Sequence, residues 1–328
     1  MLLLVLFFAL LNLANQSYID ESVLNGVHLK VGTIVQPPFL IRNGTEYYGF
    51  LIDILKKIAD RLNFQYKIYE VADDMYGSVN KYGRWNGLIG EVIFHTADVA
   101  IAPLSITTGR SRVVDFTLPY MATGIVMAAQ RPKKGDPLPF NHVSGLLGKP
   151  EFTYGTIKAG STFSFFQNSK SKIATAMFSE MTKNYANLPN TVSEGLHRAA
   201  TDKNFIFLGE GAMIEYEVGV QCNLIAIGHE LNIVEYGFAF PPGSSQVSEF
   251  NRLIQILKDE GIIAELKRKW WRGDCPKAKL CVCDELSSEE SSVEERESAG
   301  LQDSNNSVNS IVQSFTVVLF LVSLLSVL

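Results

Sequence analysis

The stretch ADVAIAPLSITTGRSRVVDFTLPY, residues 97–120, is the part of the chain around which the rest is organised. It opens with an apolar run, residues 99–102, which predicts a short buried strand that ends at Pro103. The hydroxyl residue Ser105 and the base Arg110 follow within a few positions. A guanidinium fork beside backbone and hydroxyl groups is well suited to bind a carboxylate. This stretch therefore predicts an anion site.

Arg110 and one further candidate segment also have a simpler structural explanation. Arg110 can instead form a surface ion pair with Asp98 or Asp115. Residues 159–162, AGST, open a helix and place amides and hydroxyls where an anion can bind, but the same pattern is typical of an ordinary helix N-cap. Glu210 lies just past the end of another apolar strand and is a candidate acid.

Length and charge set the broad class. The chain has 328 residues, enough for two domains, and its formal charge of −5 with no basic stripe argues against nucleic-acid binding. Residues 1–14 form an apolar N-terminal run, which predicts a secretory signal, residues 1–17, with cleavage near residues 14–17. The alternative is an uncleaved anchor. We expect no cofactor and no metal.

Secretion makes disulfides possible. The four cysteines, Cys222, Cys275, Cys281 and Cys283, allow three pairings. Cys281 and Cys283 are too close in sequence to bridge each other without strain, so a bond between Cys222 and Cys275, which closes a long loop, is the more natural one. The triplet at Asn43 matches a glycosylation acceptor in a turn-like setting.

Strands and helices alternate along the globular part. The patterns predict strands within residues 26–41, 64–71, 121–130, 152–156, 205–208, 224–227 and 236–240, and helices within residues 47–62, 88–94, 140–147, 161–168, 174–181, 191–200 and 247–271. Strand and helix in alternation are typical of an α/β protein with mainly parallel sheets.

The C-terminal part has a different composition. Residues 276–310 are acidic and rich in serine with almost no core residues, so we expect a stalk. Residues 311–328 form an apolar tail that reaches roughly 27 Å as a helix, marginal for a membrane span. The small residues 298–300 and a polar spacer precede it, which predicts a glycosylphosphatidylinositol (GPI) signal with attachment at Ser298. The alternative is a tail that spans the membrane.

Several segments together resemble the ligand-binding domain of ionotropic glutamate receptors, most closely the AMPA and kainate classes, and more distantly bacterial family 3 amino-acid-binding proteins. The segments are YYGFLID (47–53), WNG (85–87), APLSIT (102–107) with Arg110, VDFT (114–117), AGST (159–162), Glu210 with Met213, and KWW (269–271). The resemblance covers roughly residues 26–275.

The resemblance implies a two-lobed clamp of the type II periplasmic-binding-protein kind, each lobe a mostly parallel sheet with flanking helices. Lobe 1 would comprise residues 26–122 and 240–275, lobe 2 residues 123–239, and two crossing strands would form the hinge. The family also has a disulfide where Cys222 and Cys275 stand.

The resemblance also implies the ligand contacts, by Tyr76, Pro103, Ser105, Arg110, Ser161, Thr162 and Glu210. Arg110 would bind the α-carboxylate with Ser105 and an amide of residue 161 or 162. The Pro103 carbonyl and Glu210 would bind the ammonium, Tyr76 would cover the ligand, and Thr162 would bind a distal carboxylate. Glutamate at position 210, where glycine- and D-serine-binding relatives have aspartate, favours L-glutamate.

The departures from the family indicate a protein without a channel. The receptors carry pore segments between the two halves of this domain, whereas here that place holds the linker RPKKGDPLP, residues 131–139. Thr108, Ser111 and Leu118 do not match the family's dimer contacts, so we expect a monomer. We therefore expect an extracellular amino-acid-binding protein, tethered to the outer leaflet of the plasma membrane, that serves alone or with a receptor or other cell-surface protein.

Three other functions remain as alternatives: a glycine or D-serine binder, an accessory or decoy subunit of a glutamate receptor, and an enzyme such as a clamp-fold dehydratase. We do not expect the chain to be an enzyme, because we find neither a second carboxylate nor a histidine in the sequence that would pair with Glu210.

Overall fold

A computed structural model describes residues 22–133, 136, 140–158 and 160–273. The chain divides into two compact units, residues 1–278 and 279–328, and every described residue lies in the first. The predicted signal, stalk and apolar tail, Cys275, Cys281, Cys283 and Ser298 all lie outside the described residues. In the part that is described, no helix is long and apolar enough to cross a bilayer.

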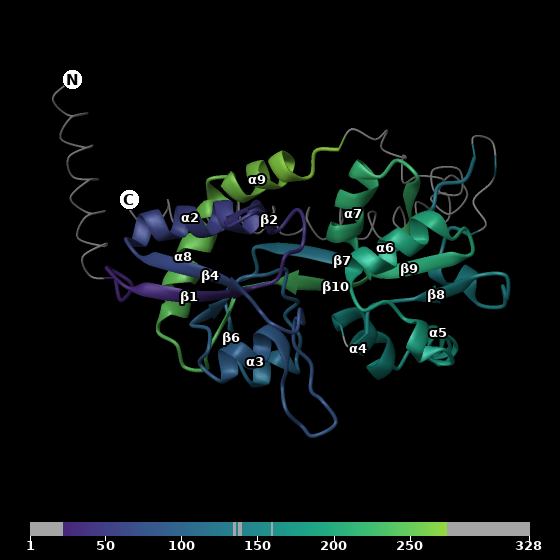
Figure 1. The fold of residues 1–328 in the computed structure, drawn as a ribbon, viewed down its shortest axis with the longest axis horizontal. Helices are drawn as coiled ribbons and strands as arrows, with labels where there is room; N and C mark the ends of the chain where they lie inside the picture. Colours follow the sequence, from purple (N-terminus) through teal and green to yellow (C-terminus); the bar gives the residue numbers. More distant parts are fainter. Residues whose placement is uncertain (1–21, 134–135, 137–139, 159, 274–328) are drawn as a thin grey trace, which may run out of the picture. The chain divides into compact units, whose positions relative to one another are not determined.

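The first of two main sheets has five strands in the order β4-β1-β5-β11-β6. In Figure 1 the helices α2 and α9 lie on one side of it and α3 on the other. Helix α8 packs against α2 and α9. The strands are β1 (His28–Thr33), β4 (Gln65–Glu70), β5 (Val99–Ala100), β6 (Asp115–Phe116) and β11 (Ala239–Phe240). The helices are α2 (Phe50–Leu62), α3 (Gly87–Ile93), α8 (Gln246–Asp259) and α9 (Ile262–Trp270).

The second sheet has four strands in the order β10-β7-β9-β8. Helices α6 and α7 cover one face and α4 and α5 the other (Figure 1). The strands are β7 (Met121–Gln130), β8 (Thr153–Gly155), β9 (Phe205–Glu210) and β10 (Leu224–Tyr236). The helices are α4 (Ser161–Asn168), α5 (Lys172–Thr182), α6 (Val192–Thr201) and α7 (Gly211–Val220).

Helices α2 and α6 are held against their sheets by buried residues. The side chains of α2 at helical spacing are buried, as the sequence predicted, and pack on the first sheet. Helix α6 approaches the second sheet closely because Gly195 has no side chain: a Cβ atom there would lie 2.3 Å from the Phe207 ring. The described part of the chain also contains three short 3₁₀ turns: η1 (Arg110–Arg112), η2 (Val143–Leu146) and η3 (Tyr185–Asn187).

The α/β class is confirmed, with two sheets flanked by helices. The strand directions are more mixed than the prediction of mostly parallel sheets. β1 runs parallel to β4 and β5, and β8 parallel to β9, but β11 runs antiparallel to β5 and β6, and β7 antiparallel to β9 and β10. The cause is connectivity: the chain enters the second sheet on β7 and leaves it on β10, so these two strands must point in opposite directions.

Two local predictions were wrong. Residues 47 and 48, which were predicted to begin a helix, belong instead to a hairpin of β2 (Ile41–Asn43) and β3 (Glu46–Tyr48). The turn of this hairpin follows Asn43 and contains Gly44, which has φ 61°. Residues 211–220 form the helix α7, for which no element was predicted. The sequence pattern did not predict helix α7 because its small and apolar residues are distributed around the helix rather than along one face.

Residues 236–240 join the two sheets, and they lie beside residues 104–120. The Ile106 amide donates to the Glu235 carbonyl at 2.8 Å, and the Tyr120 amide donates to the Tyr236 carbonyl at 2.9 Å. This crossing brings the end of β10 next to the stretch that contains Arg110, and so prepares the site described below.

Candidate ligand-binding site

The structure brings all seven predicted contact residues to one small cavity of about 20 Å³. They come from segments far apart in sequence: the loop after β4, the residues that follow β5, the 3₁₀ turn η1, the first turn of α4 and the end of β9. The seven are Tyr76, Pro103, Ser105, Arg110, Ser161, Thr162 and Glu210. Their roles as ligand contacts stay predictions.

The Glu210 carboxylate is the acceptor at the centre of this cavity. Its Oε1 atom accepts hydrogen bonds from the Ser105 hydroxyl at 2.6 Å and the Ser161 hydroxyl at 2.7 Å. Its Oε2 atom accepts from the Tyr236 hydroxyl at 2.6 Å. The side chain is 8% exposed. Hydrogen bonds to a charged group are roughly twice as strong as neutral ones, so these contacts compensate for the burial of the carboxylate.

Arg110 is a buried cation whose hydrogen bonds go to backbone carbonyls. Its Nη1 donates to the Ser105 carbonyl at 2.9 Å, and its Nη2 donates to the Gly77 carbonyl at 3.2 Å. Gly77 has φ 123°, a conformation that favours glycine, and it aims this carbonyl at the guanidinium. Within the described residues, no carboxylate lies within 4.0 Å of the Arg110 guanidinium nitrogens. Burial lowers the pKa of Arg110 to about 10, against the opposing effect of Glu210.

The alternative surface ion pair for Arg110 is wrong. Asp98 accepts a hydrogen bond from the Lys30 amide at 2.7 Å, and Asp115 accepts one from the Gly243 amide at 2.7 Å. Arg110 itself is only 4% exposed. The positive charge is therefore held inside the protein, facing the cavity, rather than on the surface.

Two buried hydroxyls that line the cavity have no hydrogen-bond partner among the described residues. They are the Tyr76 Oη and Thr156 Oγ1 atoms. Burial, followed by the charge of Glu210, raises the pKa of Tyr76, so its hydroxyl stays protonated and able to donate. An unsatisfied buried polar group costs on the order of 1–3 kcal/mol, so both hydroxyls are placed to bond a molecule that enters the cavity.

Sequence reasoning missed Tyr236 and Thr156. Tyr236 lies at the end of a strand, and its periodicity signals only burial; its hydrogen bond to Glu210 depends on the crossing of the chain between the sheets. Thr156 directly follows β8 and resembles any residue at a strand end. No feature of their local sequence separates either residue from an ordinary core position.

The cavity is small because the two sheets are linked across it by hydrogen bonds to Glu210. A volume of about 20 Å³ holds about one water molecule. A wider groove of about 840 Å³ adjoins it and shares Arg110, Gly160 and Ser161 as lining residues. A molecule the size of an amino acid therefore needs the two sides of the cavity to separate before it can enter. No group of three or more histidine, cysteine or acidic side chains is arranged to hold a metal ion in the described ranges.

Comparison with known proteins finds one matching family and several similar proteins. Residues 27–133 match the family described as "Ligated ion channel L-glutamate- and glycine-binding site". The chain is 26% identical over 389 residues to the protein named glutamate receptor ionotropic, kainate glr-3, of Caenorhabditis elegans, covering 83% of this chain and 46% of that protein. It is 27% identical over 390 residues to glutamate receptor ionotropic, kainate 4, of Rattus norvegicus, covering 80% of this chain and 40% of that protein.

A third relative has a more comparable extent. The protein named probable glutamate receptor of Anas platyrhynchos is 24% identical over 357 residues, covering 75% of this chain and 73% of that protein. The chain thus spans less than half the length of the first two relatives, and about three quarters of the third. The described part of the chain is similar to the ligand-binding domain of ionotropic glutamate receptors.

We expect Tyr236→Phe to lower the free energy of unfolding by about 1.5–3 kcal/mol near pH 8, because a buried hydrogen bond to the Glu210 carboxylate is lost. Burial and Glu210 raise the pKa of Tyr236 above its ordinary value of 10.0. The stabilisation is therefore complete below pH 10 and declines as the pH rises further, since the unfolded tyrosine then loses its proton first. The difference between parent and variant should shrink above pH 10.

Urea unfolding from pH 8 to pH 11 measures this difference. Tyr82→Phe is the matched control, because Tyr82 is 76% exposed and should show no change. Equal stability of the parent and Tyr236→Phe at pH 8 would contradict the assignment.

Proposed function

We propose that the chain binds L-glutamate in the cavity lined by Arg110 and Glu210. One observation supports this proposal above all. The buried Arg110 guanidinium, which has no carboxylate partner among the described residues, and the buried Glu210 carboxylate line the same small cavity. An α-amino acid supplies a carboxylate for the first and an ammonium for the second, with charge-assisted hydrogen bonds at both ends. The similarity to glutamate receptors supports this choice of ligand.

In this proposal Arg110 binds the α-carboxylate bidentately, with the Ser105 hydroxyl as a second donor. Glu210 and the Pro103 carbonyl bind the ammonium. Ser105 and Ser161 currently donate to Glu210 Oε1, so an entering ammonium replaces them as the donor to that oxygen. The two hydroxyls are then available to the ligand carboxylates. Tyr76 covers the ligand, and its unpartnered hydroxyl finds an acceptor there.

The distal carboxylate would lie at the N-terminus of α4. The helix begins at Ser161 with Gly160 as N-cap, and no side chain caps its first amides. Thr162 is 4% exposed and lines the same cavity. Exposed amides and a hydroxyl at a helix N-terminus favour an anion.

Glycine or D-serine is the second candidate ligand. The family description that matches residues 27–133 names both L-glutamate and glycine, and a volume of about 20 Å³ is closer to what a small amino acid requires. L-Glutamate remains the first choice because position 210 carries glutamate, where the resemblance associates aspartate with glycine and D-serine, and because Thr162 lines the cavity as a partner for a distal carboxylate. The ligand experiments below separate the two.

We also propose that the chain binds its ligand without forming a channel and without catalysis. The alignment with the nematode relative spans 389 residues, more than the 328 of this chain, so part of the matched span of that relative has no counterpart here. Among the described residues that line the inner cavity, Glu210 is the only acidic one, and none is a histidine. These residues therefore offer no second carboxylate and no imidazole for acid–base chemistry on a bound amino acid. An accessory or decoy role beside a true receptor is the alternative to an independent binding protein.

The proposed location is the outer face of the plasma membrane. The signal at residues 1–17 would direct secretion, a GPI group at Ser298 would anchor the chain, and residues 276–310 would act as the stalk. The Cys222–Cys275 disulfide and glycosylation at Asn43 fit that compartment. Asn43 is exposed in the β2–β3 turn, where a glycan has room.

We expect L-glutamate to bind the full chain in a calorimetric titration and Arg110→Ala to lose at least about a hundredfold in affinity, because a bidentate charged contact disappears. Arg110→Lys keeps the charge but not the fork, and should lose about tenfold. Arg112→Ala, in the same 3₁₀ turn but exposed, is the matched control and should bind as the parent does. Parent affinity in a folded Arg110→Lys variant would contradict the carboxylate assignment.

Thr162→Ala should weaken L-glutamate binding roughly tenfold or more and change glycine binding less than about threefold, because only glutamate has a distal carboxylate. Thr175→Ala, an exposed threonine on α5, is the control. Competition titrations with both amino acids measure the two affinities. An equal loss for both would remove Thr162 from the distal site, and binding of glycine alone would establish the second candidate ligand.

Phosphatidylinositol-specific phospholipase C should release the protein from the surface of cells that express it, because the enzyme cleaves GPI anchors. The released fraction is measured by immunoblot, with a transmembrane-anchored protein as the control that stays on the cells. Retention of this chain after treatment would favour the spanning tail instead.

A further inference from the structure

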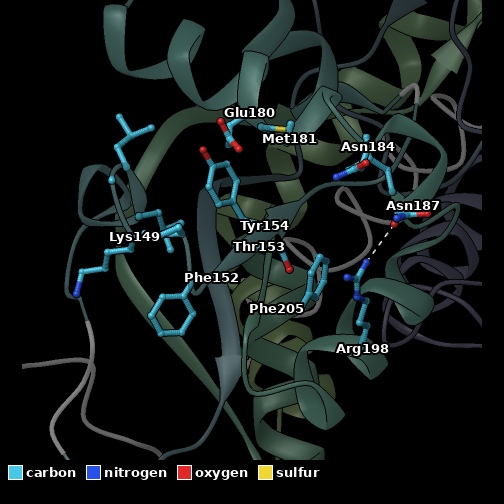
Figure 2. Close-up of a pocket in the computed structure, with 15 residues that line it drawn as sticks. Lys149, Phe152, Thr153, Tyr154, Glu180, Met181, Asn184, Asn187, Arg198 and Phe205 are labelled. Atoms are coloured by element: carbon cyan, nitrogen blue, oxygen red, sulfur yellow. Dashed lines mark hydrogen bonds between the residues drawn. The ribbon is translucent and has the colours of Figure 1, made fainter.

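A second cavity, of about 350 Å³, lies beside β8 at the edge of the four-stranded sheet. Figure 2 shows it between Tyr154 of β8, Glu180 and Met181 of α5, and Arg198 in the last turn of α6. None of its lining residues belongs to the cavity around Arg110. Its volume falls in the range of small-molecule sites, about 300–1,000 Å³.

Part of the wall of this cavity is apolar and buried. Four of its side chains, Leu146, Met181, Leu188 and Phe205, are each no more than 4% exposed. The Phe152 ring stands on the side opposite Arg198 in Figure 2. Such a wall favours the apolar body of a ligand, since each Å² of apolar surface removed from water contributes about 25 cal/mol.

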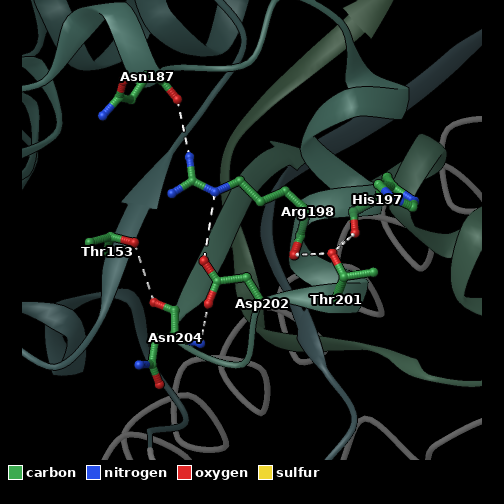
Figure 3. A network of polar contacts seen from close by, with 7 residues as sticks. All are labelled: Thr153, Asn187, His197, Arg198, Thr201, Asp202 and Asn204. Atoms are coloured by element: carbon green, nitrogen blue, oxygen red, sulfur yellow. Dashed lines mark hydrogen bonds and ion pairs between the residues drawn. The ribbon is translucent and has the colours of Figure 1, made fainter.

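Arg198 is held at the rim by contacts on several sides (Figure 3). Its guanidinium lies over the Phe205 ring at 3.8 Å from the centroid, and its Nη1 donates to the Asn187 carbonyl at 3.1 Å. Its Nε is 3.8 Å from the Asp202 carboxylate, too far for a hydrogen bond. No hydrogen bond from its Nη2 to another described residue is found, and the side chain is 37% exposed, so it can donate to an entering anion.

Asp202 is itself bound elsewhere. Its Oδ1 accepts from the Asn204 amide at 3.0 Å (Figure 3), and the Asn204 carbonyl accepts from the Thr153 amide at 2.8 Å. These contacts tie the turn after α6 to β8. The other carboxylate oxygen, Oδ2, forms an ion pair with Arg198 Nε at 3.8 Å, so an anion that binds Arg198 does so beside this carboxylate.

Tyr154 supplies a second polar group. It lines the cavity, is 7% exposed, and its hydroxyl has no hydrogen-bond partner among the described residues. Burial, followed by the charge of Glu180, raises the pKa of Tyr154 to about 12, so the hydroxyl is a donor at neutral pH. Glu180 in turn forms an ion pair with Lys183 at 2.5 Å, which offsets its repulsion of an anion.

We propose that this cavity binds a small amphipathic anion, with an aromatic or aliphatic body and one carboxylate or sulfonate group. Arg198 binds the anionic group, and the apolar wall, to which the Tyr154 ring belongs, contacts the body. The site is separate from the amino-acid cavity and does not depend on the ligand assigned there. A zwitterionic amino acid suits it poorly, because the one acidic lining residue, Glu180, is already paired with Lys183.

The probe is 8-anilinonaphthalene-1-sulfonate, an aromatic sulfonate whose fluorescence rises in apolar surroundings, titrated into the full chain. We expect Arg198→Gln to weaken its binding about tenfold. Thr153→Trp should abolish binding at this site, because the exposed Thr153 lines the cavity and a larger side chain fills it. Arg61→Gln is the matched control, since it removes one exposed charge far from the cavity and should bind as the parent does.

Unchanged probe binding in both Arg198→Gln and Thr153→Trp would overturn the proposal, as would an equal loss in Arg61→Gln, which would indicate unspecific attraction of charge. Thermal unfolding of each variant identifies any loss that comes from a damaged fold, and Thr153→Trp leaves the backbone ladder of β8 intact. Titration with L-glutamate in the same variants keeps this test independent of the amino-acid site.

Discussion

The hydrogen bonds of the Glu210 carboxylate are the interaction on which the arrangement of the site depends. Three hydroxyls converge on it, from Ser105 beside the first sheet, Ser161 on α4 and Tyr236 at the end of β10. A buried carboxylate without such partners is strongly unfavourable, so the segments that carry these donors must meet at this point. One side chain thus connects both sheets and the strand that joins them.

Arg110 presents the complementary constraint. Its charge is buried, and its hydrogen bonds to the carbonyls of Ser105 and Gly77 hold it in place without neutralising it. A cation held in this way attracts an anion from solution more strongly than an exposed arginine does, since little solvent screens it. The positions of Arg110 and Glu210 around one cavity are the basis of the proposed recognition of a zwitterion.

The second cavity rests on a different arrangement. There the arginine is at the rim, stacked over Phe205, and the walls are mostly apolar. In our proposals the inner cavity binds a ligand by charge at two ends, whereas the one beside β8 binds an apolar body with a single negative group. The two proposed ligands therefore differ in class, although both cavities are lined by residues of the four-stranded sheet.

The sequence by itself determined the α/β class and elements such as α2 and β7, which apolar periodicity marks. It also indicated Arg110, Ser161 and Glu210 as candidate contact residues, because they follow recognisable element ends. It did not determine the strand directions, the helix α7 or the role of Tyr236. Those depend on how the chain crosses between the sheets, which brings residues distant in sequence to the same place. Periodicity reports whether a side chain is buried, and only the tertiary structure decides which partner it meets there.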